Sequence, residues 1–210
     1  MTKSINHSSV MKVLDWAYEK TLNGVPGLDT VDELARKFMM QEGTLHQKAD
    51  SLIRWQNAKA GTSGFITGIG GLMTLPVAIP ANLASVLFIQ VRMIAAIAHM
   101  GGYNLRDDKV KTLVFICLAG NFAKDIIQET GIMIGTKLTA KVLESVSERS
   151  LIAINKRIGF SLLSKYGGNG TINIGKAVPL VGGIIGGTVD AVTTNIIGNT
   201  ARNMFIETGK

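Results

Sequence analysis

A long uncharged stretch dominates the sequence, because no Asp, Glu, Lys or Arg occurs between Lys59 and Arg92. Pro76 and Pro80 interrupt this stretch, and proline removes a backbone donor and disfavours helix at the preceding residue. One straight helix therefore cannot run through it. We expect a short glycine-rich helix, a turn at the two prolines, and a second helix from about Pro80 to about Met100.

The second of these helices carries polar residues on an otherwise apolar surface. A charged side chain is costly near the middle of a lipid-facing helix, so Arg92 should face protein, water or a lipid headgroup. The pattern fits a core helix of a soluble bundle with a satisfied polar stripe, and the alternative is a helix that lines a polar pocket or meets lipid. The stripe at helical spacing consists of Asn82, Ser85, Arg92 and His99, and Gln90 lies off it.

Composition favours one domain with an anionic partner surface. The 210 residues are 46% hydrophobic and 18% charged, enough to bury a substantial core, and a net charge of +7 favours anionic lipid. Nucleic acid is not expected as a partner, because the basic residues are dispersed and no recognition motif occurs. The lone Cys117 should be a buried thiol, and the N-terminal residues lack a secretory signal core, so we expect a cytoplasmic protein or one at the cytoplasmic face of a membrane.

We divide the expected single domain, residues 1–210, into three blocks. Residues 1–60 should form amphipathic helices that cover the apolar centre, the second opened by a capping box from Thr30 to Glu33 and running to about Glu42. Residues 61–130 contain the apolar hairpin and a further helix that starts at Asp107 and Asp108 and continues to about residue 130. Residues 131–210 contain a basic segment and a glycine-rich helix.

No catalytic or metal-binding pattern stands out. Paired Asp107 and Asp108 are explained by capping of a helix start, since acids there satisfy free amides and the helix dipole. The segment from Gly170 to Lys176 matches the start of a phosphate-binding loop, but Ala177 replaces the Ser or Thr that binds magnesium. Three histidines and the absence of a nucleophile motif disfavour a zinc site or a catalytic triad. We therefore expect no metal and no cofactor.

The most basic segment is a candidate for membrane contact. Apolar residues alternate there with lysines and arginines, as at a membrane interface where basic groups meet headgroups and apolar groups point inward. A solvated face on a core helix explains the same pattern equally well. The candidate contact residues are Lys137, Lys141, Lys156, Arg157 and Lys165.

Small residues recur along the glycine-rich C-terminal helix and form a ridge that lets another helix approach closely, within the chain or in a homo-oligomer. Asp190 interrupts this ridge, and a carboxylate there needs a cationic or donor partner, for which Arg92, His99 and Arg202 are available. The ridge contains Gly182, Gly186, Asp190, Thr194 and Gly198, with Asn195 in the adjacent row.

Several of these segments together resemble the bacterial EcsC family. The resemblance rests on the glycine-proline centre with Gln90 and Arg92, on DDKVKTLVFICLAG and INKRIGF, and on VPLVGGIIGGTVDA with Asp190. It extends over roughly residues 10 to 207. The family takes its name from a gene beside a two-component ABC exporter, which implies a membrane-associated accessory role. No reaction is established for the family, so the resemblance assigns no catalytic residue.

The sequence therefore predicts an all-α single-domain bundle whose proline-broken hairpin packs on the glycine-rich C-terminal helix. We expect a non-enzymatic accessory protein that contacts an anionic membrane or a membrane-protein partner and assists transport or secretion, peripheral or partly inserted. One alternative is a hydrolase or transferase acting on a lipid-like substrate in a pocket formed by Arg92, His99 and Asp190, with Asn82, Gln90, Asn195 and Arg202 nearby. Another is a pore-forming or toxin-like hairpin.

Overall fold

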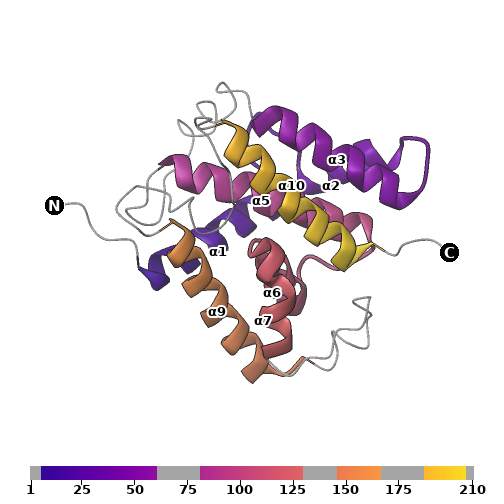
Figure 1. Ribbon diagram of the computed structural model, residues 1–210. Helices are drawn as coiled ribbons and strands as arrows, with labels where there is room; N and C mark the ends of the chain where they lie inside the picture. The colour runs from indigo at the N-terminus through magenta and orange to yellow at the C-terminus, as the bar shows by residue number, and fades with distance from the viewer. Residues whose placement is uncertain (1–5, 61–80, 130–145, 167–186, 207–210) are drawn as a thin grey trace.

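The computed structural model describes residues 6–60, 81–129, 146–166 and 187–206, and this part of the chain folds into an all-α bundle (Figure 1). Helix α5 (Ala81–Met100) lies at its centre and packs against helices from both ends of the chain. The expected fold class is thus confirmed. The helices around α5 are α1 (His7–Asn23), α2 (Val31–Met39), α3 (Leu45–Ala60), α6 (Asp108–Cys117) and α10 (Gly187–Phe205).

Helix α5 is covered on all sides. Every residue from Leu87 to Ala98 is buried, which accounts for a helix that is apolar around most of its circumference. The three N-terminal helices all contact it, as expected for amphipathic helices that cover the centre. Helix α5 begins directly after Pro80, while Pro76 and the first arm of the expected hairpin lie outside the described residues.

Local capping fixes the starts of the N-terminal helices. Asn6 caps α1, where its side chain accepts a bond from the Ser9 amide at 2.8 Å. Thr30 and Glu33 form the expected capping box at the start of α2, with bonds of 3.2 Å to the Glu33 amide and 2.8 Å from the Thr30 amide. The amide and the hydroxyl of Thr30 both donate to the Glu33 carboxylate, and these two bonds lower the pKa of Glu33 because they stabilise its ionised form.

Helix α2 ends at Met39, three residues before the expected end at Glu42. Gly43 has a φ of +104°, in the left-handed region, and it starts the turn into the next helix. Thr44 then caps α3 together with Gln47, in the same reciprocal arrangement as Thr30 and Glu33. This second capping box sets the start of α3 and was not predicted from the sequence.

The helix expected from Asp107 to about residue 130 is interrupted. Asp107 caps α6 by accepting a bond from the Lys109 amide at 2.8 Å, which confirms a capping role for this carboxylate. Helix α6 ends at Cys117, whose thiol is buried as expected, and burial raises its pKa. Gly120, with a φ of +60°, breaks the helix. A short 3₁₀ turn, η1 (Gly120–Phe122), and a separate helix, α7 (Ala123–Glu129), follow.

Small residues bring α10 close to its neighbours, as expected for the glycine-rich helix. At Gly198 an added Cβ would lie 2.8 Å from Cγ1 of Ile53 on α3, so a larger side chain does not fit there. Gly101, at the end of α5, similarly faces the carbonyl of Phe205 at the end of α10. The described part of the ridge is therefore used inside the chain, whereas Gly182 and Gly186 lie outside the described residues.

Candidate functional site

Arg92 and His99, the charged and titratable residues of the polar stripe, point from α5 toward the start of α2. Arg92 is 5% exposed, and its Nη2 donates to the backbone carbonyl of Asp29 at 2.5 Å. Burial lowers the pKa of Arg92, and the nearby Asp29 carboxylate opposes that shift. His99 Nε2 lies 3.6 Å from Asp32 Oδ1 in a partly exposed contact. The structure therefore brings these two residues to one side of α5, where they fasten α2.

Gln90 is the most deeply buried polar residue of the predicted set. It is 1% exposed, and neither its Nε2 nor its Oε1 has a hydrogen-bond partner among the residues that the structure describes. An amide in that state costs about 1–3 kcal/mol. Asn82 begins the same helix, and its side chain is not among those described. Gln90 is thus a polar feature inside the core, without a surface site around it.

The predicted residues of α10 face α3. Arg202 pairs with Asp50, whose second carboxylate oxygen lies 3.4 Å from Nδ1 of His46. Asn195 accepts a bond from Asn57 Nδ2 at 3.3 Å. These contacts fasten the C-terminal helix to α3.

The pairing expected for Asp190 is not tested, because its side chain lies outside the described set. The enzymatic alternative requires Asp190 in one pocket with Arg92 and His99, and it stays a prediction. What the structure adds is that Arg92 and His99 already have contacts within the chain, to a backbone carbonyl and to a carboxylate.

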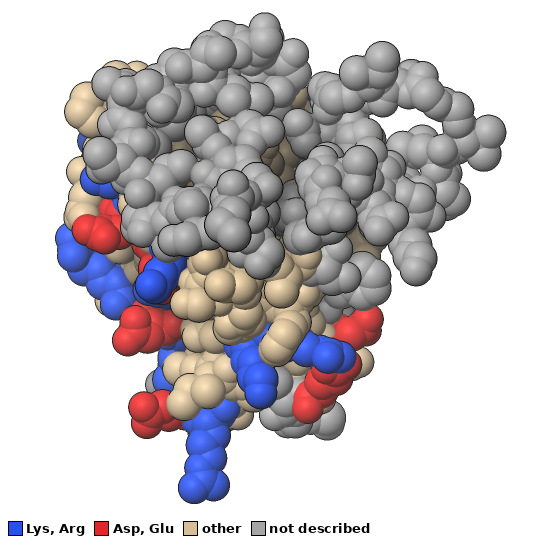
Figure 2. Space-filling view, turned by 90° about the vertical axis from the view of Figure 1, so that its left-hand side faces the viewer, with Lys and Arg blue, Asp and Glu red and all other residues tan. Residues whose placement is uncertain are grey.

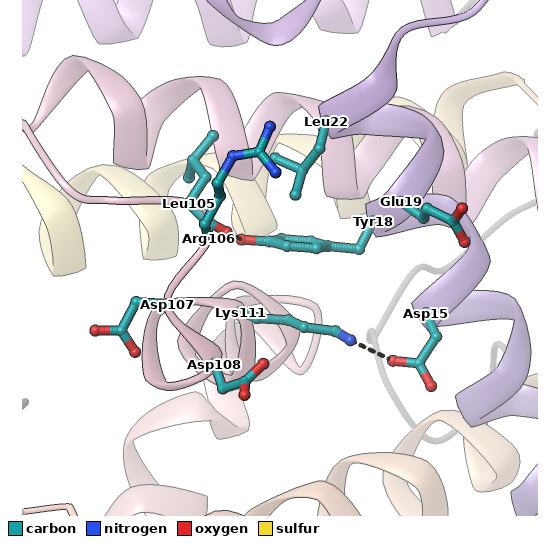
Figure 3. A pocket seen from close by; sticks show the side chains of 9 residues that line it. All are labelled: Asp15, Tyr18, Glu19, Leu22, Leu105, Arg106, Asp107, Asp108 and Lys111. Atoms are coloured by element: carbon teal, nitrogen blue, oxygen red, sulfur yellow. Dashed lines mark hydrogen bonds and ion pairs between the residues drawn. The ribbon is translucent and has the colours of Figure 1, made fainter.

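A cavity of about 330 Å³ opens between α1 and α6 (Figure 3). Lys111 reaches across it to Asp15, with 2.8 Å between Nζ and Oδ1, and its ammonium lies 5.8 Å from the centre of the Tyr18 ring. The Tyr18 hydroxyl donates to the Leu105 carbonyl at 2.7 Å. Burial raises the pKa of Tyr18, and the charges of Asp107 and nearby Asp108 raise it further, so the phenol stays protonated.

Two contacts line this cavity, the ion pair between Lys111 and Asp15 and the hydrogen bond from the Tyr18 hydroxyl to the Leu105 carbonyl. Both Lys111 and Tyr18 therefore already have partners within the chain. Sequence analysis singled out Asp107 and Asp108 from its lining but missed the others. The only sequence signal was the pair of acids at the helix start, because Asp15 and Lys111 are far apart in the chain. Within the described part of the chain, no group of three or more His, Cys, Asp or Glu side chains could hold a metal ion.

A surface of mixed apolar and basic character lies on helix α9 (Glu148–Tyr166). Its inner face packs against α1, α6 and α7 through Ile154, Ile158 and Leu162, which are fully or almost fully buried. On the outer side Ile152 is 63% exposed and Phe160 is 50% exposed. We define the α9 outer face as the exposed residues Arg149, Ile152, Ala153, Lys156, Arg157 and Phe160, and the acidic Glu148 one turn before Ile152 is exposed at its edge.

Lys156 lies between the two exposed apolar side chains, because positions 152, 156 and 160 follow one another at intervals of one helical turn. Figure 2 views the molecule from the side on which α9 lies in Figure 1, and it shows Lys and Arg side chains around an uncharged area, with acidic groups at the margins. Arg157 pairs with Glu129 through two contacts of 2.9 Å, so its charge is partly neutralised.

The α9 outer face contains two of the residues predicted to contact a membrane, Lys156 and Arg157, both exposed. The side chain of Lys165, also on α9, is not described, and Lys137 and Lys141 lie outside the described residues. His7 of α1 fixes the position of this surface, since its Nε2 donates to the Lys156 carbonyl at 3.2 Å and its ring lies 5.1 Å from that of Phe160.

Comparison with protein families identifies the chain. A model described as the EcsC protein family matches residues 8–206, which is nearly the whole sequence. The chain belongs to the EcsC family. The resemblance seen in the glycine-proline centre and in the C-terminal segment is therefore confirmed. This EcsC chain has no match among the curated proteins or among the solved structures with which it was compared.

Among the described residues of this EcsC chain, no helix combines the length and the apolar character that a bilayer span requires. Helix α5 comes nearest in composition, and Arg92 within it is held by the carbonyl of Asp29.

Proposed function

We propose that this EcsC protein is a non-enzymatic accessory protein that binds the anionic cytoplasmic face of a membrane through the α9 outer face. There it assists a membrane process such as ABC-type transport or secretion, the role that the family name implies. The observation that supports membrane binding is the exposure of Ile152 and Phe160 on either side of Lys156. Apolar side chains interleaved with basic ones are typical of helices that lie in a membrane interface.

The size of the surface predicts weak, reversible binding. Complete burial of one such apolar side chain contributes about 1.5–3 kcal/mol, so half-covered Ile152 and Phe160 together supply roughly 2–3 kcal/mol. Arg149 and Lys156 add about 1 kcal/mol each near an anionic surface. A total of roughly 4–5 kcal/mol corresponds to a dissociation constant of about 0.2–1 mM in accessible lipid.

Vesicle sedimentation tests this proposal. Wild-type protein should bind vesicles that contain phosphatidylglycerol, bind vesicles of phosphatidylcholine alone much less, and lose binding as salt is raised, because screening weakens the electrostatic part. Ile152→Asn and Lys156→Gln should each weaken binding about three- to tenfold. Matched controls are Val192→Asn and Lys20→Gln, which make the same changes at exposed positions on α10 and α1.

Equal binding to both kinds of vesicle, or no binding at low salt, would contradict the proposal. So would a loss of binding in the Val192 and Lys20 variants as large as that in the α9 variants. Far-ultraviolet circular dichroism of each variant checks that the helical fold is retained.

A further inference from the structure

The turn between α2 and α3, residues 39–45, exposes a second group of large apolar side chains. Met40 is 81% exposed, Met39 is 39% exposed and Leu45 is 36% exposed. Three such residues within one short turn form an apolar tip, whereas isolated exposed apolar residues are ordinary on protein surfaces.

The tip is held in place by its own backbone and by neighbouring side chains. The Met40 amide donates to the Arg36 carbonyl at 3.0 Å, and the Thr44–Gln47 capping box orders the far side of the turn. Lys48 Nζ donates to the Met39 carbonyl at 2.8 Å, which ties the base of the turn together. The exposure of Met40 is thus a property of an ordered turn with its main polar groups satisfied.

Basic residues flank this tip in the sequence, on both helices that it joins. Arg36 and Lys37 lie in the last turn of α2, and Lys48 lies in the first turn of α3, against the single acid Glu42 between them. Cations below an apolar tip complement an anionic bilayer, in which the apolar groups enter the acyl region and the cations remain with the headgroups.

The tip and the α9 outer face lie on different sides of the bundle. Figure 1 shows the α2–α3 turn at the right-hand edge, whereas α9 lies at the lower left with other helices between them. One flat bilayer that lies against the α9 outer face is therefore turned away from Met40.

We propose that the α2–α3 turn inserts into a second anionic bilayer while the α9 outer face holds the first, so that one EcsC molecule bridges two membrane surfaces. This inference rests on the proposed function of α9. It assigns a lipid contact to the exposed side chains of Met39, Met40 and Leu45.

A two-vesicle capture assay tests the bridge. Vesicles containing phosphatidylglycerol are immobilised and protein is added, and fluorescent vesicles of the same composition are then offered with the protein still in solution, because the binding expected of α9 is weak and reversible. Wild-type protein should capture the second vesicles. Met40→Asn should bind the immobilised vesicles through α9 but capture about tenfold fewer of the second, the loss expected for one apolar side chain withdrawn from lipid. Gln41→Asn is the matched control, an uncharged change at the neighbouring exposed position.

The outcomes separate this inference from the proposal on which it rests. Binding of wild-type protein without capture overturns the bridge and leaves the α9 contact standing, whereas failure to bind any vesicle overturns both. Capture that persists in the Met40 variant also overturns it, and light scattering after size exclusion then shows whether pairing of two molecules, each bound through α9, accounts for the capture.

Discussion

Replacement of Gly198 by alanine should destabilise the protein, although alanine is the better helix former. An added Cβ would lie 2.8 Å, 2.9 Å and 3.1 Å from Cγ1, Cγ2 and Cδ1 of Ile53. Ile53 is 2% exposed and branched at Cβ, so it cannot turn away into open space. Overpacking of this kind costs about 1–3 kcal/mol, against a gain of up to about 1 kcal/mol in helix propensity. We expect a net loss of about 1–2 kcal/mol in the free energy of unfolding.

The sign of the effect should reverse when Ile53 is shortened. Ile53→Ala removes all three crowded atoms at a cost of about 2–5 kcal/mol. In that background the change Gly198→Ala should stabilise the protein, because only the propensity gain and some filling of the cavity remain. Urea unfolding followed by circular dichroism measures all four proteins of this double-mutant cycle.

Asn199→Ala, at the next position of the same helix, is a control for a change to alanine away from Ile53. Stabilisation by Gly198→Ala in the wild-type background would refute the reasoning. An equal loss with and without the Ile53 side chain would also refute it, since the crowding would then lie elsewhere.

Two further predictions concern polar groups. The pKa of Glu33 is lowered in the fold, so its stabilising effect should be present above the ordinary value near 4.5 and be lost as pH falls through the lowered value. Glu33→Gln should accordingly be less stable than wild type near neutral pH, with the difference narrowing at low pH; a constant difference in unfolding midpoint across the titration would contradict the capping assignment. Arg92→Met should cost about 1–3 kcal/mol by leaving the Asp29 carbonyl unpaired, with vesicle binding per folded molecule unchanged; a selective loss of binding would instead make Arg92 a lipid contact.

Local sequence signals predicted local structure well. Thr30 with Glu33, and Asp107 of the acidic pair, marked two helix starts correctly, because these capping bonds join residues only two or three positions apart. The sequence also contains a signal for the start of α3, a threonine at position 44 followed three residues later by glutamine. That signal uses Gln in place of Glu and was missed.

Partners across the fold were not predictable in the same way. The need to satisfy Arg92 followed from its place in an apolar helix, but its partner is a backbone carbonyl, a group that every residue carries. Asn195 and Arg202 likewise find their partners, Asn57 and Asp50, on α3. Sequence periodicity gives the spacing along one helix, and it does not give which other helix lies against each face.

The α9 outer face illustrates the same limit for a candidate site. Ile152 and Ile154 are equivalent in composition, yet one is 63% exposed and the other 1% exposed. Their difference arises from the packing of α1, α6 and α7 on one side of the helix only. Membrane contact by the basic segment stays a prediction, and the residues that form its exposed apolar part could be identified only from the structure.

Burial of α5 from both ends of the chain has a consequence during synthesis. Helix α10 covers part of α5, yet Phe205 leaves the ribosome about a hundred residues after Met100. At a translation rate of roughly 5–20 residues per second, α10 is completed about 5–20 s after α5. During that interval the nascent chain exposes the part of α5 that α10 later covers, and slow translation of the last third would prolong that exposure.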